Sequence, residues 1–159
     1  HKHFQGTKGI KLIHITGDGE YKSVLSQLGI TDGNGLGDSS VILPYLHDMP
    51  KALAAADLAV FRSGAIGLAE LAVRGIPSVL VPYPYAAEDH QTYNARIFVQ
   101  EGAAHMIVDQ MLSAHDLIGE IEMFMANRDL LSQMGERALQ LGKPNAAHDI
   151  AKLALSIAK

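Results

Sequence analysis

The sequence predicts an α/β fold with a Rossmann-like, doubly wound parallel sheet, and three observations support this. Short apolar runs without polar alternation, such as Leu58 to Phe61 and Pro77 to Val81, are typical of strands covered on both faces. Leu117, Ile121 and Phe124 recur at the spacing of a helix lying on a sheet. Strands and helices alternate along the chain, which favours parallel strands joined by crossover helices.

Composition excludes several classes of protein. The 159 residues suit one domain, 1–159, and 48% of them are hydrophobic, as in a globular protein. A net charge of −4, from 13 basic and 17 acidic residues, gives no strong attraction to nucleic acid or anionic lipid. The absence of cysteine excludes disulfides and thiolate chemistry. No signal peptide and no apolar run of membrane-spanning length is visible.

The first third of the chain predicts a strand at Ile10 to Ile15 and a helix from about Glu20 to Leu28. Between them, the Thr16 to Gly19 segment favours a strand-closing turn over a phosphate loop, because its glycine spacing does not match the full fingerprint. The Gly- and Asp-rich stretch from Thr31 to Ser40 lacks apolar periodicity. We expect it to be a mobile loop on the face away from the ligand.

The predicted strand from Leu58 to Phe61 is followed by a tight turn, Arg62-Ser63-Gly64. Ser63 stands where a helix N-cap belongs, and the N–H groups of the first turn behind it have no intrahelical partners. With the helix dipole they form an anion site that Gly64 lets a phosphate approach closely. A plain helix cap explains the same residues equally well.

Glu70 adds a second feature to this helix. It follows Ile66 by four residues, so both share one side of the helix with Gly67. A carboxylate at this distance from a phosphate-binding turn can accept two hydrogen bonds from a ribose diol. In isolation, a solvated surface glutamate is the alternative interpretation.

Polar side chains follow the next strand, Pro77 to Val81. The prolines of Pro82 to Tyr85 prevent the strand from continuing, and the Glu88 to Thr92 stretch then supplies hydrogen-bonding groups. Because this stretch lies at the carboxyl end of a strand, we expect it to contact a hydroxyl-rich ligand.

The rest of the chain predicts further regular elements. They are a strand at Val41 to Leu43, a helix to Ala56 that Asp48 can cap, a helix from Ala95 to Glu101 closed by Gly102, a strand at Ala104 to Val108, and helices at Ser113 to Asn127, Asp129 to Leu141 and Ala146 to Ala158. The eight histidines are scattered without metal-ligand spacing. We therefore assign no metal site and no catalytic base.

Three ordered motifs resemble those of a known family. They are Arg-Ser-Gly-Ala-x-x-x-x-Glu from Arg62, Gly-x-Pro-x-x-x-x-Pro from Gly75 and Asp-x-Gln-x-x-Asn-Ala from Asp89. Together they resemble the C-terminal, donor-binding domain of the MurG family of GT-B glycosyltransferases, glycosyltransferase family 28. The resemblance extends from His14 to the final helix.

The resemblance implies a hexosyltransferase that moves N-acetylglucosamine, with inversion, from UDP-N-acetylglucosamine to lipid I (undecaprenyl-diphospho-muramoylpentapeptide) in peptidoglycan synthesis. It implies no cofactor, and a cytoplasmic enzyme that is peripheral to the plasma membrane at full length. An N-terminal acceptor domain with a Gly-rich loop would hold the lipid and the catalytic base. We therefore expect this chain to be a fragment that binds the donor and is inactive alone.

The resemblance also assigns residue roles. Tyr45 would stack near the uracil, and the Leu46 backbone would pair with the edge of that base. The phosphate turn would be formed by Arg62, Ser63 and Gly64, and the diphosphate and sugar would be lined by Ala65, Ile66 and Gly67. Glu70 would bind the ribose, His90 would reach a phosphate, and the N-acetylglucosamine would be contacted by Gln91 and Thr92. Gly67 and Thr92 depart from the family, which can carry a hydroxyl residue and a second glutamine there. A core position is the alternative for Tyr45.

Two other functions remain compatible with the sequence. One is a stand-alone donor-binding subunit that docks on a membrane partner, as in the eukaryotic enzyme that adds the second N-acetylglucosamine to a dolichol-linked sugar. The other is a related lipid glycosyltransferase that uses UDP-glucose or UDP-galactose. The polar residues around Gln91 favour the acetylated sugar.

Overall fold

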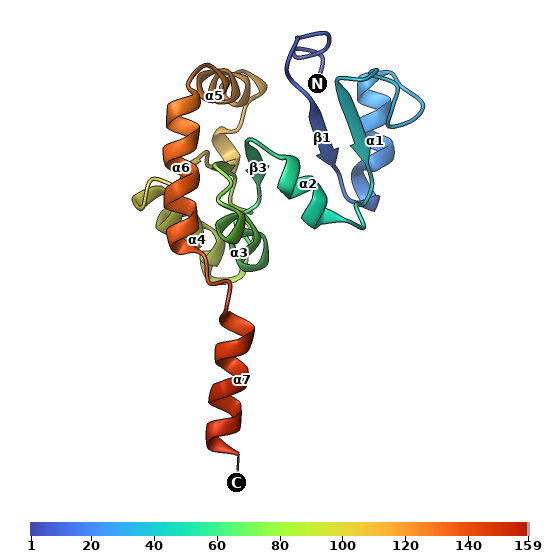
Figure 1. Cartoon of the computed structure of the whole chain (residues 1–159). Coiled ribbons are helices and arrows are strands. Elements are labelled where there is room, and N and C mark those ends of the chain that lie inside the picture. The colour runs from blue at the N-terminus through green and yellow to red at the C-terminus, as the bar shows by residue number, and fades with distance from the viewer. Residues whose placement is uncertain (159) are drawn as a thin grey trace. The chain divides into compact units, whose positions relative to one another are not determined.

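The computed structural model describes residues 1–158 and divides the chain into two compact units. Unit 1 is His1–Ala52 and unit 2 begins at Leu53, so the division falls within one helix. Figure 1 shows the elements in chain order. They are β1 (Leu12–Ile15), α1 (Asp18–Leu28), β2 (Ser40–Leu43), α2 (Met49–Ala55), β3 (Ala59–Phe61), α3 (Ala65–Arg74), β4 (Ser78–Leu80), η1 (Ala87–Asp89), α4 (His90–Gln100), β5 (Ala104–Met106), η2 (Asp109–Met111), α5 (Ala114–Ala126), α6 (Arg128–Leu141) and α7 (Ala146–Ile157).

Unit 1 is built on one parallel strand pair. β1 pairs with β2 from Leu12 opposite Ser40 to Ile15 opposite Leu43, and α1 connects the two strands. Ile42 is fully buried and forms the unit's core with residues of α1 and of the following loop. The predicted strand and helix of this region are therefore present, with β1 beginning two residues later than expected.

The segment from 31 to 40 contradicts our expectation of a mobile loop, because it packs into the core of unit 1. Leu36 is buried against Leu25 and Ile42. The carbonyl oxygen of Gly33 accepts a hydrogen bond from the backbone N–H of Ile42 at 2.9 Å. A Cβ atom on Gly33 would overlap the carbonyl oxygen of Ile42, so only glycine lets the loop approach β2 this closely.

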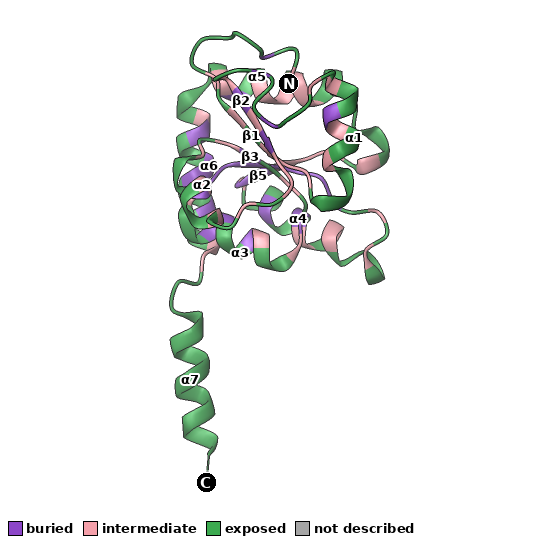
Figure 2. Ribbon diagram, turned by 90° about the vertical axis from the view of Figure 1, so that its right-hand side faces the viewer, coloured by how far each residue is buried: buried purple, intermediate pink, exposed green. Residues whose placement is uncertain are grey.

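Unit 2 contains a second parallel sheet in the order β3-β4-β5. Its central strand, β4, is buried along its whole length, as its continuous apolar run predicts. Helix α3 connects β3 to β4, and α4 connects β4 to β5, which is the crossover arrangement of an α/β fold. Figure 2 shows the buried residues gathered along these strands and the inner sides of the helices.

The hydrophobic core of unit 2 joins the sheet to the two helices that follow it. Val79 of β4 packs with Phe124 of α5 and with Leu131 and Met134 of α6. Phe124 is fully buried, and removing such a side chain from water stabilises a fold by about 1.5–3 kcal/mol. The predicted helical spacing in α5 is therefore confirmed as a core-facing stripe. Ser113, the first residue of the predicted helix, is the N-cap of α5 and accepts a hydrogen bond from the N–H of Asp116 at 3.1 Å.

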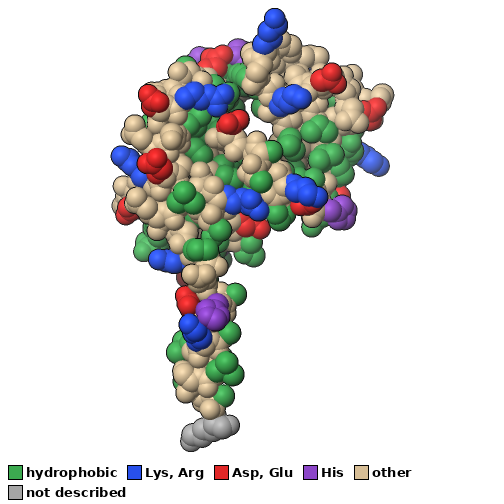
Figure 3. All heavy atoms as spheres, in the orientation of Figure 1, with side chains coloured by type: hydrophobic (Ala, Val, Ile, Leu, Met, Phe, Trp, Pro, Cys, Tyr) green, Lys and Arg blue, Asp and Glu red, His purple; other side chains and the backbone are tan. Residues whose placement is uncertain are grey.

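Helix α7 extends from unit 2 with every described residue exposed (Figures 2 and 3). Its large apolar side chains are between 64% and 77% exposed: Ile150, Leu153, Leu155 and Ile157. Within residues 1–158, no helix combines the length and the apolar character needed to cross a bilayer.

Gly33 provides a test of the packed loop in unit 1. We predict that Gly33→Ala lowers the free energy of unfolding by about 1–3 kcal/mol, because the new methyl group forces the loop away from β2. Gly19→Ala is the control, since a Cβ there meets no atom within 4 Å. Urea denaturation of both variants would contradict the account if Gly33→Ala were as stable as Gly19→Ala.

Candidate functional site

The candidate site of unit 2 lies where β3, β4 and β5 end. The turn at residues 62–64 follows β3, the segment at 81–86 follows β4, and η2 follows β5. Because the three strands are parallel, their carboxyl ends meet at one edge of the sheet. Ligands of open α/β sheets bind at such an edge.

The N-terminus of α3 offers free backbone donors at this edge. Gly64 is the N-cap, in extended conformation, and the first bond of the helix runs from the N–H of Leu68 to the Gly64 carbonyl at 3.0 Å. The N–H groups of Ala65, Ile66 and Gly67 precede that bond and have no partner within residues 1–158. With the helix dipole, they form a site suited to an anion.

Ser63 is not the N-cap, which corrects our prediction. Its hydroxyl donates instead to the backbone oxygen of Gln91 at 2.8 Å, and its side chain is fully buried. Asn94 in turn donates from Nδ2 to the Ser63 carbonyl at 3.1 Å. The helix begins one residue later than the serine suggests, because the hydroxyl is used to fasten the turn to α4.

Gln91 lies in the first turn of α4, since this helix begins at His90 and not after Ala95 as we expected. Its Oε1 accepts a hydrogen bond from the N–H of Tyr83 at 3.0 Å. The Nε2 group is thereby left as a donor, and it would lie 3.9 Å from a Cβ on Gly64. Gln91 therefore places an amide donor beside the N-terminus of α3.

The other polar residues of this turn make local hydrogen bonds. His90 Nδ1 donates to the Ala87 carbonyl at 2.7 Å, which leaves Nε2 available. Thr92 donates from its hydroxyl to the Asp89 carboxylate at 2.6 Å, so that hydrogen is already engaged. Glu88 and Asp89 have φ of 51° and 53°, a left-handed conformation that costs energy in non-glycine residues and is often found at binding sites.

Glu70 is exposed on the second turn of α3 and has no hydrogen bond or ion pair within the described part of the chain. It follows the 79%-exposed Ile66 by four residues and therefore lies on the same side of the helix. Its carboxylate is free to accept hydrogen bonds from a ligand.

Arg62 forms a link that the sequence did not reveal. Its Nη1 group donates to the carbonyls of Val81 and Pro82, each at 3.2 Å, and forms an ion pair with Asp109 at 2.5 Å. The guanidinium carbon lies 5.7 Å from the centre of the Tyr83 ring. We predicted a phosphate contact for Arg62, whereas in the structure it also joins the segments after all three strands. The sequence indicated a role for Asp109 only in that this acidic residue directly follows the predicted last strand, Ala104 to Val108.

Gly67 lies against the ring of Phe61. A Cβ atom at this position would lie 2.6 Å from an edge carbon of the Phe61 ring. The ring, at the end of β3, therefore occupies the space that a threonine or serine would need. A glycine at 67 accommodates the bulky aromatic at 61.

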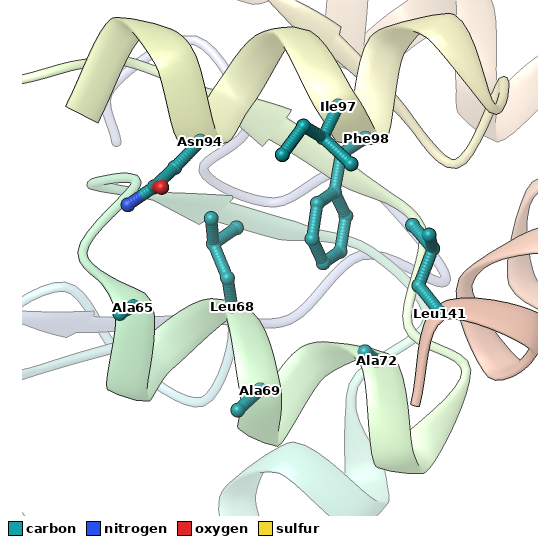
Figure 4. Close-up of a pocket in the computed structure, with 8 residues that line it drawn as sticks. All are labelled: Ala65, Leu68, Ala69, Ala72, Asn94, Ile97, Phe98 and Leu141. Atoms are coloured by element: carbon teal, nitrogen blue, oxygen red, sulfur yellow. The ribbon is translucent and has the colours of Figure 1, made fainter. Parts of the chain in front are cut away.

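An apolar groove of about 200 Å³ separates α3 from α4 in Figure 4. Leu68 and Phe98 line it from facing helices, and Asn94 lies at one end and Leu141 at the other. Its apolar lining does not suit a diphosphate. The polar candidate site therefore lies at the strand ends and not in this groove.

Two predicted residues belong to unit 1. Tyr45 follows β2, is 62% exposed and packs edge-on against the His47 ring at 5.0 Å, so it is not a core residue. Leu46 is half-buried. Asp48 accepts a hydrogen bond from the N–H of Lys51 at 3.3 Å at the start of α2, which confirms its predicted capping role.

The parallel sheets, their crossover helices and the polar strand ends define an α/β domain of the Rossmann-like class. The chain belongs to the glycosyltransferase family 28 C-terminal domain family, whose model matches residues 1–153. Both the predicted fold class and the predicted family are therefore confirmed.

Named relatives cover the chain almost completely. Proteins of Desulforamulus reducens and Desulfitobacterium hafniense are 39% and 40% identical to it over 95% and 99% of its length. Both are named UDP-N-acetylglucosamine–N-acetylmuramyl-(pentapeptide) pyrophosphoryl-undecaprenol N-acetylglucosamine transferase. The chain spans 41% and 42% of their lengths.

Solved structures agree with this assignment. MurG of Acinetobacter baumannii is 29% identical, with a TM-score of 0.76 over 91% of this chain and 42% of that protein. The glycotransferase of kitacinnamycin shares the fold, with a TM-score of 0.61 at 20% identity over 92% of this chain and 43% of that one.

The contact between Phe61 and Gly67 gives a stability prediction. We expect Gly67→Thr to lower the free energy of unfolding by about 1–3 kcal/mol through overpacking against the ring. The double variant Phe61→Ala/Gly67→Thr should lose less stability than the sum of its two single variants.

Gly119→Thr is the matched control, because a Cβ at this helix position meets no atom within 4 Å. Chemical denaturation measures all four variants. Additive losses in the double variant would contradict the steric explanation.

Proposed function

We propose that this chain is the donor-binding part of a glycosyltransferase that moves N-acetylglucosamine from UDP-N-acetylglucosamine to an undecaprenyl-diphosphate-linked acceptor in peptidoglycan synthesis. The names of the relatives support this reaction. The free N-terminus of α3, next to the Gln91 amide, is the observation that carries the proposal. In this proposal, the catalytic base, the lipid site and the membrane contact are supplied by a part of the full-length enzyme other than this chain.

In this proposal, the diphosphate lies against the free N–H groups of Ala65, Ile66 and Gly67. As the bond between the sugar C1 and the diphosphate oxygen breaks, negative charge develops on the leaving UDP. Preorganised N–H donors and the positive end of the helix dipole stabilise that charge without reorganising. This unit therefore orients the donor and assists departure of the leaving group.

The remaining predicted residues supply selectivity. Gln91 Nε2 donates to the bound sugar, and Glu70 accepts from the two ribose hydroxyls. The His90 ring, with a hydrogen on both nitrogens, donates from Nε2 to a phosphate oxygen, and Thr92 accepts from the sugar through the lone pairs of its hydroxyl. Uracil binding by Tyr45 and Leu46, which belong to unit 1, stays a prediction from the family resemblance. The full-length enzyme acts at the cytoplasmic face of the plasma membrane.

Calorimetric titration tests the donor assignment. We expect the chain to bind UDP-N-acetylglucosamine more tightly than UDP-glucose, because a site built for the acetamido group leaves polar atoms unpaired with other sugars. Equal affinity for both sugars and for UDP would reduce the proposal to a general UDP site. Tighter binding of UDP-glucose would contradict the assigned sugar.

Glu70 tests the ribose contact. We predict that Glu70→Ala weakens UDP binding by about 1–3 kcal/mol, since a charged hydrogen-bond acceptor is lost, while the melting temperature stays unchanged. Glu136→Ala, an exposed acid on α6, is the control and should bind normally. Unchanged affinity together with a lowered melting temperature would assign Glu70 a structural role instead.

A further inference from the structure

We propose that Asp109 is a positioning residue for the donor site: through Arg62 it fixes the peptide between Pro82 and Tyr83, and through that peptide the side-chain amide of Gln91. The inference rests on the proposed function, because it concerns the same site. Asp109 opens η2, three residues after the end of β5, and none of the sequence motifs includes it.

The central feature is a single peptide plane that is held from both sides. The Pro82 carbonyl oxygen accepts from Arg62 at 3.2 Å, and the N–H of Tyr83 donates to Gln91 Oε1 at 3.0 Å. A carbonyl and the following N–H belong to one rigid planar unit. Any rotation of this plane therefore breaks or redirects both hydrogen bonds together.

Asp109 determines where the Arg62 guanidinium lies. The Arg62 side chain is half-exposed, and a long, flexible side chain loses conformational entropy when it is ordered. The carboxylate of Asp109, at 2.5 Å, compensates for that loss and holds Nη1 on the carbonyls of Val81 and Pro82. The Tyr83 ring, 5.7 Å from the guanidinium, supports the same position.

The orientation of Gln91 follows from this arrangement. An amide side chain presents an acceptor on one side and donors on the other, and the fixed N–H of Tyr83 selects Oε1 as its partner. Nε2 is then turned to the Gly64 side, where the ligand's oxygen atoms are proposed to lie. If the peptide plane were free to rotate, the amide could flip and offer the ligand an acceptor in place of a donor.

A matched pair of variants of the whole chain tests the proposal. Asp109→Ala removes the ion pair to Arg62. Asp57→Ala is the control, because Asp57 forms an exposed ion pair with Arg128 in the same unit, at 3.3 Å, without contacting this network. The two measurements are amide hydrogen exchange of Tyr83 in the free protein and affinity for UDP-N-acetylglucosamine.

We expect Asp109→Ala to accelerate Tyr83 exchange and to weaken donor binding by about threefold to tenfold, while Asp57→Ala changes neither. Adding Asp109→Ala to Arg62→Ala should cause no further loss of affinity, because both act through one contact. Asp109→Glu, which keeps the carboxylate, should restore slow exchange. The melting temperature should be similar in Asp109→Ala, Asp109→Glu and Asp57→Ala, since exposed ion pairs add little stability.

Unchanged Tyr83 exchange in Asp109→Ala would overturn the proposal, and so would faster exchange with unchanged donor affinity. If the unaltered chain binds no UDP-N-acetylglucosamine, the proposed donor function fails. The exchange data then decide by themselves whether Asp109 holds this peptide.

Discussion

The candidate site depends on the buried hydroxyl of Ser63. It donates to the Gln91 backbone, and Asn94 donates to the Ser63 carbonyl, so the turn after β3 and the first turn of α4 are held together. Because Ser63 is fully buried, either bond would be costly to lose without a replacement. The free N-terminus of α3 and the amide of Gln91 consequently keep a fixed spacing, which preorganised binding of a diphosphate sugar requires.

The sequence predicted most elements of the fold and pointed to the strand ends where the candidate site lies, because both inferences depend on local patterns. The apolar run of β4 indicates a strand, and the glycine after Ser63 indicates a turn, from only a few neighbouring residues. The prediction that Ser63 is the N-cap of α3 was wrong, because a hydroxyl that can cap a helix can also donate to a distant backbone oxygen. The partner, Gln91, is 28 residues away, and no local pattern reveals it.

Two further features needed the three-dimensional structure. Leu36 is a single apolar residue in a polar, glycine-rich stretch, so its burial could not be read from periodicity. Asp109 and Arg62 are 47 residues apart and meet only because β3, β4 and β5 end at one edge. From the sequence, Gly67 was noted as a departure from the family pattern; in the structure, the Phe61 ring lies 2.6 Å from where a Cβ on Gly67 would be.

We propose that the first turn of α3 binds the diphosphate of the donor. Titrating the isotopically labelled chain with UDP and following backbone amide chemical shifts tests it directly. We expect the largest shifts at Ala65, Ile66 and Gly67, and a further shift of the Gln91 side-chain amide when UDP-N-acetylglucosamine replaces UDP. Saturable binding that leaves these three amides unshifted would contradict it.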